Sequence, residues 1–148
     1  MSAVEESERA AMGRFSIEVE LANDEDIIRA KAGVIQAEQV RTIKIRGVVD
    51  SGATRLVISE AMALQLGLEM SGKTTVRYAD GRTAERSIAQ RIHLTYGGRD
   101  SVFNAIVEPV RESALIGAIV LEDLDFLIDC GGQRLLPRDP NQIISEVE

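Results

Sequence analysis

The sequence feature that most constrains the fold is an acidic residue placed between two apolar runs. Val48-Val49 precedes Asp50, and the run Leu56 to Ile58 follows it a few residues later. Short runs of β-branched and aliphatic residues are typical of buried strands. Between them, Ser51-Gly52-Ala53 supplies the small residues that a sharp turn needs. A carboxyl group is costly to bury unless it is hydrogen-bonded or used chemically, and we therefore interpret Asp50 as a catalytic residue.

The composition predicts a single folded domain. The chain has 148 residues, 45% of them hydrophobic, which is enough for one core. Aromatic residues make up only 3% and Trp is absent, so Val, Ile, Leu and Ala must fill that core. The net charge of −7 argues against a nucleic-acid partner, because phosphates bind basic surfaces. We divide the chain into a flexible acidic tail (1–13), one domain (14–137) and a C-terminal tail (138–148).

Cysteine content and hydropathy bear on the cellular compartment. Cys130 is the single cysteine, so an internal disulfide is excluded and a reduced, structural thiol is the simplest interpretation. The longest apolar run, around 114–121, is too short to span a bilayer. The acidic N-terminus does not follow the pattern of a signal peptide. These features predict a cytoplasmic protein without a membrane partner.

The first third of the chain predicts strands joined by turns. From Arg14 to Leu21 apolar and polar residues alternate, which is the period of a half-buried strand. The polar run Asn23 to Asp26 predicts a turn, after which Ile27-Ile28 is expected to begin a returning strand. A further strand is expected over 36–45, leading into the central aspartate.

Beyond Asp50, a strand over 55–58 is followed by one short helix, with Ser59 as N-cap and Gly67 at the C-terminal end. Asp80-Gly81 is the strongest hairpin signal in the chain, with arms over 74–78 and 83–88. Further strands are expected at 92–96, 102–107, 126–129 and 134–137, and a short helical pattern at 119–124. Many short strands, frequent glycine turns and one or two brief helices predict an all-β protein.

In order, Asp50-Ser51-Gly52-Ala53, the Asp80-Gly81 hairpin and the triplet Leu115-Ile116-Gly117 resemble the retropepsin-like aspartic proteases, which include retroviral proteases and bacterial relatives. The resemblance covers about residues 14–137. It implies a closed acid-protease barrel with one lobe per chain, active as a twofold dimer. Two features depart from the family pattern: the hairpin tip is more polar than the glycine-rich viral tips, and the acidic tail has no counterpart in the minimal fold.

The resemblance also implies a role for each motif. Asp50 would be catalytic, Ser51 would hydrogen-bond across the turn, and Gly52, followed by Ala53, would allow close approach of the substrate. The hairpin would form the flap that covers the substrate, and the triplet would support the turn from behind. The flap residues would be Tyr78, Ala79, Asp80, Gly81 and Arg82, and the supporting residues Leu115, Ile116 and Gly117.

The chemistry explains why such a chain would need a partner. Two carboxyl groups about 3 Å apart share one proton, as in the aspartic proteases that are the standard example. Each chain carries one such turn, so an aspartic endopeptidase requires a homodimer with a peptide or protein substrate between its subunits. We expect no cofactor and no metal. Two alternatives stay open: Asp50 caps only local amides, or the chain is a non-catalytic dimerisation or peptide-binding module.

Other motifs have simpler explanations. Residues Gly67 to Thr74 match the phosphate-binding loop pattern, but a helix precedes and a strand follows, the reverse of what that loop requires, so we expect no nucleotide. His93 is expected to be an ordinary strand histidine. The acidic residues Glu122, Asp123, Asp125 and Asp129 are expected to lie on a solvated helix face and strand end. The hairpin over 126–137 is a candidate edge for pairing with a second subunit, and Ile143-Ile144 for apolar contact.

Overall fold

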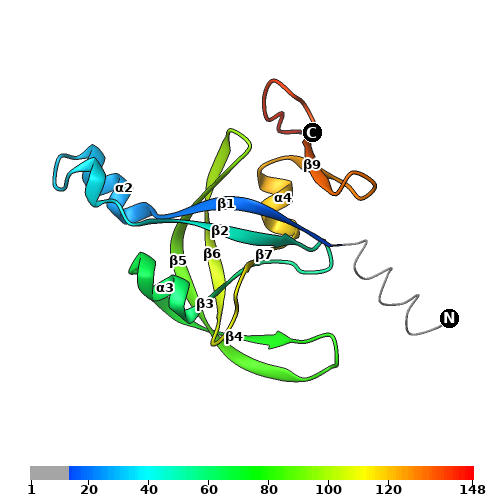
Figure 1. Ribbon diagram of the computed structural model, residues 1–148, viewed down its shortest axis with the longest axis horizontal. Coiled ribbons are helices and arrows are strands. Elements are labelled where there is room, and N and C mark those ends of the chain that lie inside the picture. The colour runs from blue at the N-terminus through cyan, green and yellow to red at the C-terminus, as the bar shows by residue number, and fades with distance from the viewer. Residues whose placement is uncertain (1–13) are drawn as a thin grey trace.

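The structure is a computed structural model that describes residues 14–148; the predicted acidic tail, 1–13, lies outside the described residues. Within the described part, strands dominate and helices are short (Figure 1). The strands are β1 (Phe15–Asn23), β2 (Thr42–Val49), β3 (Leu56–Ser59), β4 (Met70–Arg77), β5 (Thr83–Tyr96), β6 (Arg99–Glu108), β7 (Ala114–Ile116), β8 (Phe126–Asp129) and β9 (Arg134–Pro137). The helices are α2 (Asp24–Lys31), the 3₁₀ turn η1 (Ala37–Gln39), α3 (Glu60–Leu66) and α4 (Ala118–Asp123).

One sheet closes on itself to form a barrel. Its strand order is β1-β2-β7-β3-β6-β5-β4, and β1 also pairs with β5 through Leu21 and Leu94. That last pairing joins β1, β2, β7, β3, β6 and β5 into a closed ring and leaves β4 outside it as an edge strand. Closure removes the other sheet edges. The predicted all-β class and closed barrel are confirmed.

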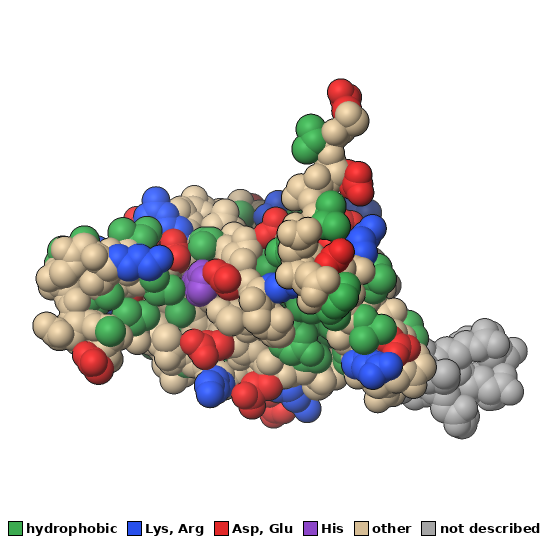
Figure 2. Space-filling view, turned by 90° about the horizontal axis from the view of Figure 1, so that it is seen from above, with side chains coloured by type: hydrophobic (Ala, Val, Ile, Leu, Met, Phe, Trp, Pro, Cys, Tyr) green, Lys and Arg blue, Asp and Glu red, His purple; other side chains and the backbone are tan. Residues whose placement is uncertain are grey.

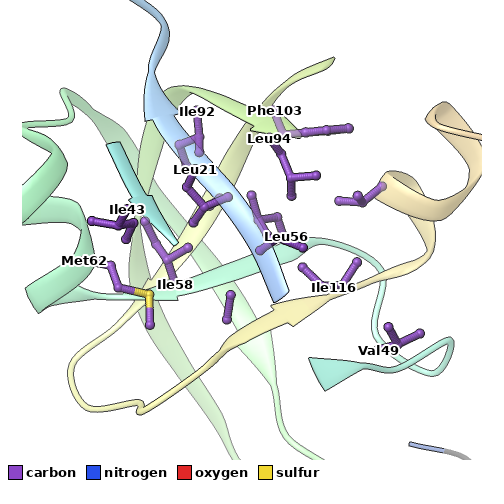
Figure 3. Close-up of a cluster of buried hydrophobic side chains, with 14 of the residues drawn as sticks. Leu21, Ile43, Val49, Leu56, Ile58, Met62, Ile92, Leu94, Phe103 and Ile116 are labelled. Carbon is purple, nitrogen blue, oxygen red and sulfur yellow. The ribbon is translucent and has the colours of Figure 1, made fainter. Parts of the chain in front are cut away.

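Aliphatic side chains fill the barrel, as the composition requires. Figure 3 shows Leu21, Leu56, Ile58, Leu94 and Ile116 pointing toward one another from four different strands, and each is almost completely buried. Alternation along β1 places Val19 and Leu21 inside and Glu18 and Glu20 outside. Burial of these side chains is the main favourable contribution to folding.

The expected turn and returning strand after β1 are wrong: residues 24–31 form helix α2. The Asn23 Oδ1 atom accepts a hydrogen bond from the Asp26 amide at 3.0 Å, which makes Asn23 the N-cap. Asp24, Glu25 and Asp26 all lie in the first helical turn, where negative charge is favourable. The same polar residues are common in turns and at helix N-termini, so the sequence pattern alone does not distinguish the two.

The strand expected over 36–45 is also shorter than predicted. Its first part forms η1, and β2 begins only at Thr42. Arg41 precedes that strand and forms an ion pair with Asp26, with 2.8 Å between Nε and Oδ2. Asp26 is buried, and the hydrogen bonds from Arg41 lower the pKa of its carboxyl group more than burial raises it. This pair fixes α2 against the start of β2.

The hairpin arms merge into long strands. Residues 83–88 and 92–96 form one strand, β5, interrupted by a bulge between Ala89 and Ile92 where Arg91 adopts a φ of 59°. Before the bulge β5 pairs with β4, and after it β5 pairs with β1. The bulge therefore marks where the chain leaves the β4–β5 hairpin and enters the barrel wall.

The short helix α3 follows the sequence prediction. Ser59 Oγ accepts a hydrogen bond from the Met62 amide at 3.1 Å, and Gly67 ends the helix with a φ of 62°. From Gly67 the chain passes directly into β4, so helix precedes strand across the segment that resembles a phosphate-binding loop. The described residues contain no helix with the length and hydropathy needed to span a bilayer.

The C-terminal part packs beside the barrel as a separate β8–β9 hairpin. Arg99 donates hydrogen bonds to the carbonyl groups of Leu124 and Asp125 and to that of Asp139 in the predicted tail. Cys130 was interpreted as a reduced, structural thiol. It is a free thiol, but it is exposed in the β8–β9 turn and does not contribute to the core.

The acidic cluster is only partly solvated. Glu122 and Asp123 are exposed, but Asp125 is buried and pairs with Arg138, with 2.9 Å between Nε and Oδ1.

His93 lies on β5 and its Nε2 atom is 2.7 Å from Asp100 Oδ2 on β6. Figure 2 shows the face that carries the histidine, where acidic and basic side chains alternate. No continuous basic surface covers that face of the described chain.

Candidate active site

Asp50 follows a strand that is held on both sides. β2 pairs antiparallel with β1, with Phe15 opposite Val49, and parallel with β7, with Val49 opposite Ile116. The Asp50 amide continues the second pairing and donates to the Ile116 carbonyl at 3.1 Å. The position of the carboxyl group is therefore determined by the barrel wall and not by a free loop.

The turn that carries Asp50, residues 50–54, is closed by two hydrogen bonds between residues two and three positions apart. The Ala53 amide donates to the Asp50 carbonyl at 3.1 Å, and the Gly52 amide donates to the Asp50 Oδ1 atom at 2.9 Å. A Cβ atom at Gly52 would lie 3.2 Å from that same oxygen, so a side chain there would press on the carboxylate. Ser51 and Gly52 are exposed, whereas the Asp50 side chain is only 18% exposed.

Arg14 is the charged neighbour of Asp50. Its Nη2 atom lies 3.3 Å from Asp50 Oδ2, and its side chain is 59% exposed. The contact was not predicted from the sequence, although the β1–β2 register contains it. With Phe15 opposite Val49, the residue before β1 must face the residue after β2.

The triplet Leu115-Ile116-Gly117 lies directly behind the turn. Just beyond it, the Ala118 and Ile119 amides donate to the Ala53 and Thr54 carbonyls at 2.8 and 2.9 Å. A Cβ atom at Gly117 would lie 2.4 Å from the Arg55 carbonyl oxygen, which is closer than any real Cβ contact. Only glycine allows the two chain segments to approach this closely.

The tip of the β4–β5 hairpin is a compact turn. The Tyr78 amide donates to the Arg82 carbonyl at 2.8 Å, and the Gly81 amide donates to the Tyr78 carbonyl at 2.9 Å. Gly81 has a φ of 87°, in the left-handed region that favours glycine. The Arg82 backbone amide, and then its guanidinium group, lower the pKa of Asp80. Ala79 is exposed at the same tip.

Tyr78, Arg86 and Glu108 form a cluster, here the Tyr78 cluster, that joins the hairpin to the barrel. The Tyr78 hydroxyl donates to Glu108 Oε1 at 2.8 Å, and Arg86 Nε lies 3.1 Å from both the Tyr78 hydroxyl and Glu108 Oε2. The hydrogen bond with Tyr78 and the interaction with Glu108 raise the pKa of Arg86. Arg86 and Glu108 were not predicted as part of the site, because only the pairing of β5 with its neighbours β4 and β6 brings them to Tyr78.

A cleft of about 640 Å³ separates the turn from the hairpin. Residues 52–55 form one wall and residues 74–78 of β4 and its end form the other. Figure 1 shows β4 and the loop at its end extending from the barrel on the side of β3 and β7. The remaining lining comes from Val57, Ile106, Glu108, Val110, Arg111 and Leu115. Among the described residues, no group of three or more His, Cys, Asp or Glu side chains is placed to hold a metal ion.

This arrangement defines a class of protein. A β-barrel with an Asp-Ser-Gly turn, a Leu-Ile-Gly triplet behind that turn and a hairpin facing it is an aspartic-protease fold. A family model described as gag-polyprotein putative aspartyl protease matches residues 35–123, more than half of the chain. The chain belongs to this retropepsin-like family.

Comparison with solved structures gives the same fold. EIAV protease complexed with the inhibitor HBY-793 is similar to this chain with a TM-score of 0.52 and 18% sequence identity. The similarity covers 75% of this chain and 88% of the viral chain. Among curated proteins, none matches this sequence.

Proposed function

We propose that the protein is an aspartic endopeptidase, active as a homodimer in which each subunit contributes one Asp50. The observation that carries this proposal is the Asp50 turn, which lies at the end of a doubly paired strand and lines the cleft with residues 52–54. Membership of an aspartyl protease family supports the same reaction. We place the enzyme in the cytoplasm, in keeping with its single exposed cysteine.

The proposed reaction uses the two carboxyl groups differently. The ionised Asp50 takes a proton from a water molecule, whose oxygen attacks the carbon of the scissile carbonyl group. The protonated Asp50 donates a hydrogen bond to the carbonyl oxygen as negative charge develops there. When the tetrahedral intermediate collapses, the carbon–nitrogen bond breaks and the leaving amine receives the proton that the first Asp50 took from water, so the pair again holds one proton. Which subunit holds the shared proton is a property of the pair.

The peptide would lie extended in the cleft, between the turn and the β4–β5 hairpin. β4 is the edge strand of the sheet and has a free side that can hydrogen-bond to an extended chain. The Gly52 amide already stabilises Asp50 Oδ1, so Oδ2 is the atom available for new contacts. Arg14 occupies that oxygen in the single chain, and this ion pair must open when the two Asp50 side chains meet.

The Arg14 contact also favours a second candidate, a non-catalytic module that keeps the fold for dimerisation or peptide binding. An aspartate held in an intrachain ion pair is what a structural turn would contain. The two candidates differ in turnover. The enzyme cleaves peptides and requires Asp50, whereas the module binds peptides or dimerises without cleaving them.

The test is cleavage of a peptide library, followed by mass spectrometry, with the wild type and Asp50→Asn at mildly acidic and neutral pH. We expect cleavage by the wild type and loss of at least about a thousandfold in Asp50→Asn, because the variant lacks the ionisable pair. Asp123→Asn, which removes an exposed carboxylate on α4, is the matched control and should keep full activity. Equal activity of the wild type and Asp50→Asn, or no cleavage by a verified wild-type dimer, would contradict the proposal.

A further inference from the structure

The charge of the cleft is opposite to that of the chain. The whole sequence contains 24 acidic residues and 17 lysines and arginines. The cleft lining instead contains three arginines, Arg55, Arg77 and Arg111, and one acidic residue, Glu108. A cationic cleft in an acidic protein concentrates anionic ligands there and repels cationic ones.

The single carboxylate of the lining is already neutralised. Glu108 accepts hydrogen bonds from the Tyr78 hydroxyl and pairs with Arg86 at 3.1 Å, and its side chain is only 16% exposed. It is therefore not placed to neutralise the three lining arginines. Within residues 14–148, none of these arginines forms an ion pair with an acidic side chain.

The three arginines are distributed around the cleft. Arg55 follows the Asp50 turn, Arg77 ends β4 beside the hairpin tip, and Arg111 lies in the connection between β6 and β7. Arg111 is fixed by a hydrogen bond from its Nε atom to the Ser113 carbonyl at 2.9 Å. Arg55 and Arg77 are exposed. Guanidinium groups present several donors in a plane and bind carboxylates in a bidentate manner.

The cleft also has an aliphatic part. Five aliphatic side chains larger than alanine line it, together with Thr54, Thr74 and Thr75: Val57, Val76, Ile106, Val110 and Leu115. The cleft therefore combines aliphatic surface with positive charge. A twofold dimer would repeat the same arrangement on the other side of the cleaved bond.

We propose, on the basis of the proposed protease function, that the substrate is an acidic peptide with aliphatic residues at the cleaved bond and Asp or Glu residues on both sides of it. Arg55, Arg77 and Arg111 are the residues that determine this specificity, by pairing with the substrate carboxylates. They do not take part in the bond-breaking step.

The experiment uses three ten-residue peptides with one aliphatic centre and flanks of Glu, Gln or Lys. Cleavage is measured with the wild type, and binding is measured by fluorescence anisotropy with full-length Asp50→Asn. We expect kcat/KM and affinity to be at least about tenfold higher for the Glu peptide than for the Gln peptide, and lowest for the Lys peptide. High salt should reduce the difference between the Glu and Gln peptides, because it screens the charges.

The matching variants are the triple substitution Arg55→Gln, Arg77→Gln and Arg111→Gln, the double reversal Arg55→Glu with Arg77→Glu, and the control Arg46→Gln. Arg46 is exposed on β2, away from the cleft lining. The triple variant should lose the Glu preference and the reversal should prefer the Lys peptide. The control should behave as the wild type.

The outcomes separate the two proposals. Cleavage of the Glu and Gln peptides at equal rates by the wild type would overturn the acidic specificity and leave the protease function standing. Preferential binding of the Glu peptide by Asp50→Asn, without cleavage of any peptide by the wild type, would support the acidic specificity and overturn the protease function. An unchanged preference in the triple variant would overturn the assignment to these arginines.

Discussion

At the scale of single residues, the parts of the site that are formed by consecutive residues were the easiest to predict. The turn at 50–53 and the triplet Leu115-Ile116-Gly117 were chosen from local sequence, and the structure brings the two together. Arg14 was missed because its contact with Asp50 depends on the β1–β2 register. Local sequence specifies residue types and turns, whereas pairing between strands specifies which side chains meet.

Gly117→Ala tests the close approach behind the turn. The added methyl group would lie 2.4 Å from the Arg55 carbonyl oxygen, which is backbone and cannot rotate away. We expect a loss of about 1–3 kcal/mol in the free energy of unfolding and a drop in peptide cleavage. Urea unfolding measures the change in the free energy of unfolding. Gly131→Ala is the control, because its nearest neighbour would lie at 3.7 Å, and its stability should stay within about 0.5 kcal/mol of the wild type.

Asp26→Asn tests the buried ion pair with Arg41. The native pKa of Asp26 is lowered, chiefly by its hydrogen bonds with Arg41, so the ionised form stabilises the fold. That contribution is complete above the unfolded pKa of about 3.9 and is lost as the pH falls through the lower native value. We expect the free energy of unfolding of the variant to be about 1–2 kcal/mol lower at neutral pH. The effect is not larger because Arg41 is half exposed and water screens the ion pair.

The measurement for Asp26→Asn is urea unfolding of wild type and variant from pH 7 to pH 3. The difference between them should narrow below about pH 4, because the unfolded wild-type chain then binds a proton at Asp26 that the folded protein still lacks. Asp24→Asn, on the same helix but without an ion pair among the described residues, should change stability by about 0.5 kcal/mol or less. A difference that stays constant over the whole pH range would show that Asp26 does not act through its charge.

At the scale of helices and strands, elements with their own capping or turn residues were predicted correctly. α3 has Ser59 and Gly67 at its ends, and the hairpin has Asp80-Gly81 at its tip. α2 was predicted wrongly because Asn23 is equally suited to a turn and to an N-cap. The start of β4 was placed too late because an exposed edge strand shows little apolar alternation.

Tyr78→Phe tests whether the Tyr78 cluster positions the hairpin over the cleft. The variant keeps the ring but removes the hydroxyl that donates to Glu108 and accepts from Arg86. We expect about a threefold to tenfold higher KM with a smaller change in kcat, because the hairpin holds the substrate less firmly. Hydrogen exchange at residues 78–84 should become faster.

The control for this prediction is Tyr96→Phe. The Tyr96 ring packs edge-on against Phe126, 5.4 Å between centroids, and its hydroxyl makes no hydrogen bond within the described residues. Its KM and hydrogen exchange should equal those of the wild type. A Tyr78→Phe protein with unchanged exchange at the hairpin would mean that the cluster only stabilises the barrel.

At the scale of the whole molecule, the number and spacing of apolar strands predict an all-β protein, but they do not predict which strands pair to close the barrel. The pairing of β1 with β5 joins residues about seventy positions apart, and the bulge at Arg91 turns β5 into that pairing. Neither has a local signal strong enough to be predicted. The need for a second subunit comes instead from chemistry, since each chain carries one Asp50 turn and the proposed reaction uses two.

Mixing wild type with Asp50→Asn tests that requirement directly. If both carboxyl groups of a dimer are needed, freely exchanging subunits at equal amounts leave about a quarter of the dimers active, so activity should follow the square of the wild-type fraction. If one Asp50 sufficed, about three quarters of the dimers would be active at equal amounts, and this result would contradict the requirement for two. Activity proportional to the wild-type fraction would mean that the two kinds of subunit do not form mixed dimers, so capture of the untagged subunit by a tagged one must first show that mixed dimers form. Asp123→Asn mixed in the same way should leave the activity unchanged at every ratio, since that carboxylate lies on α4.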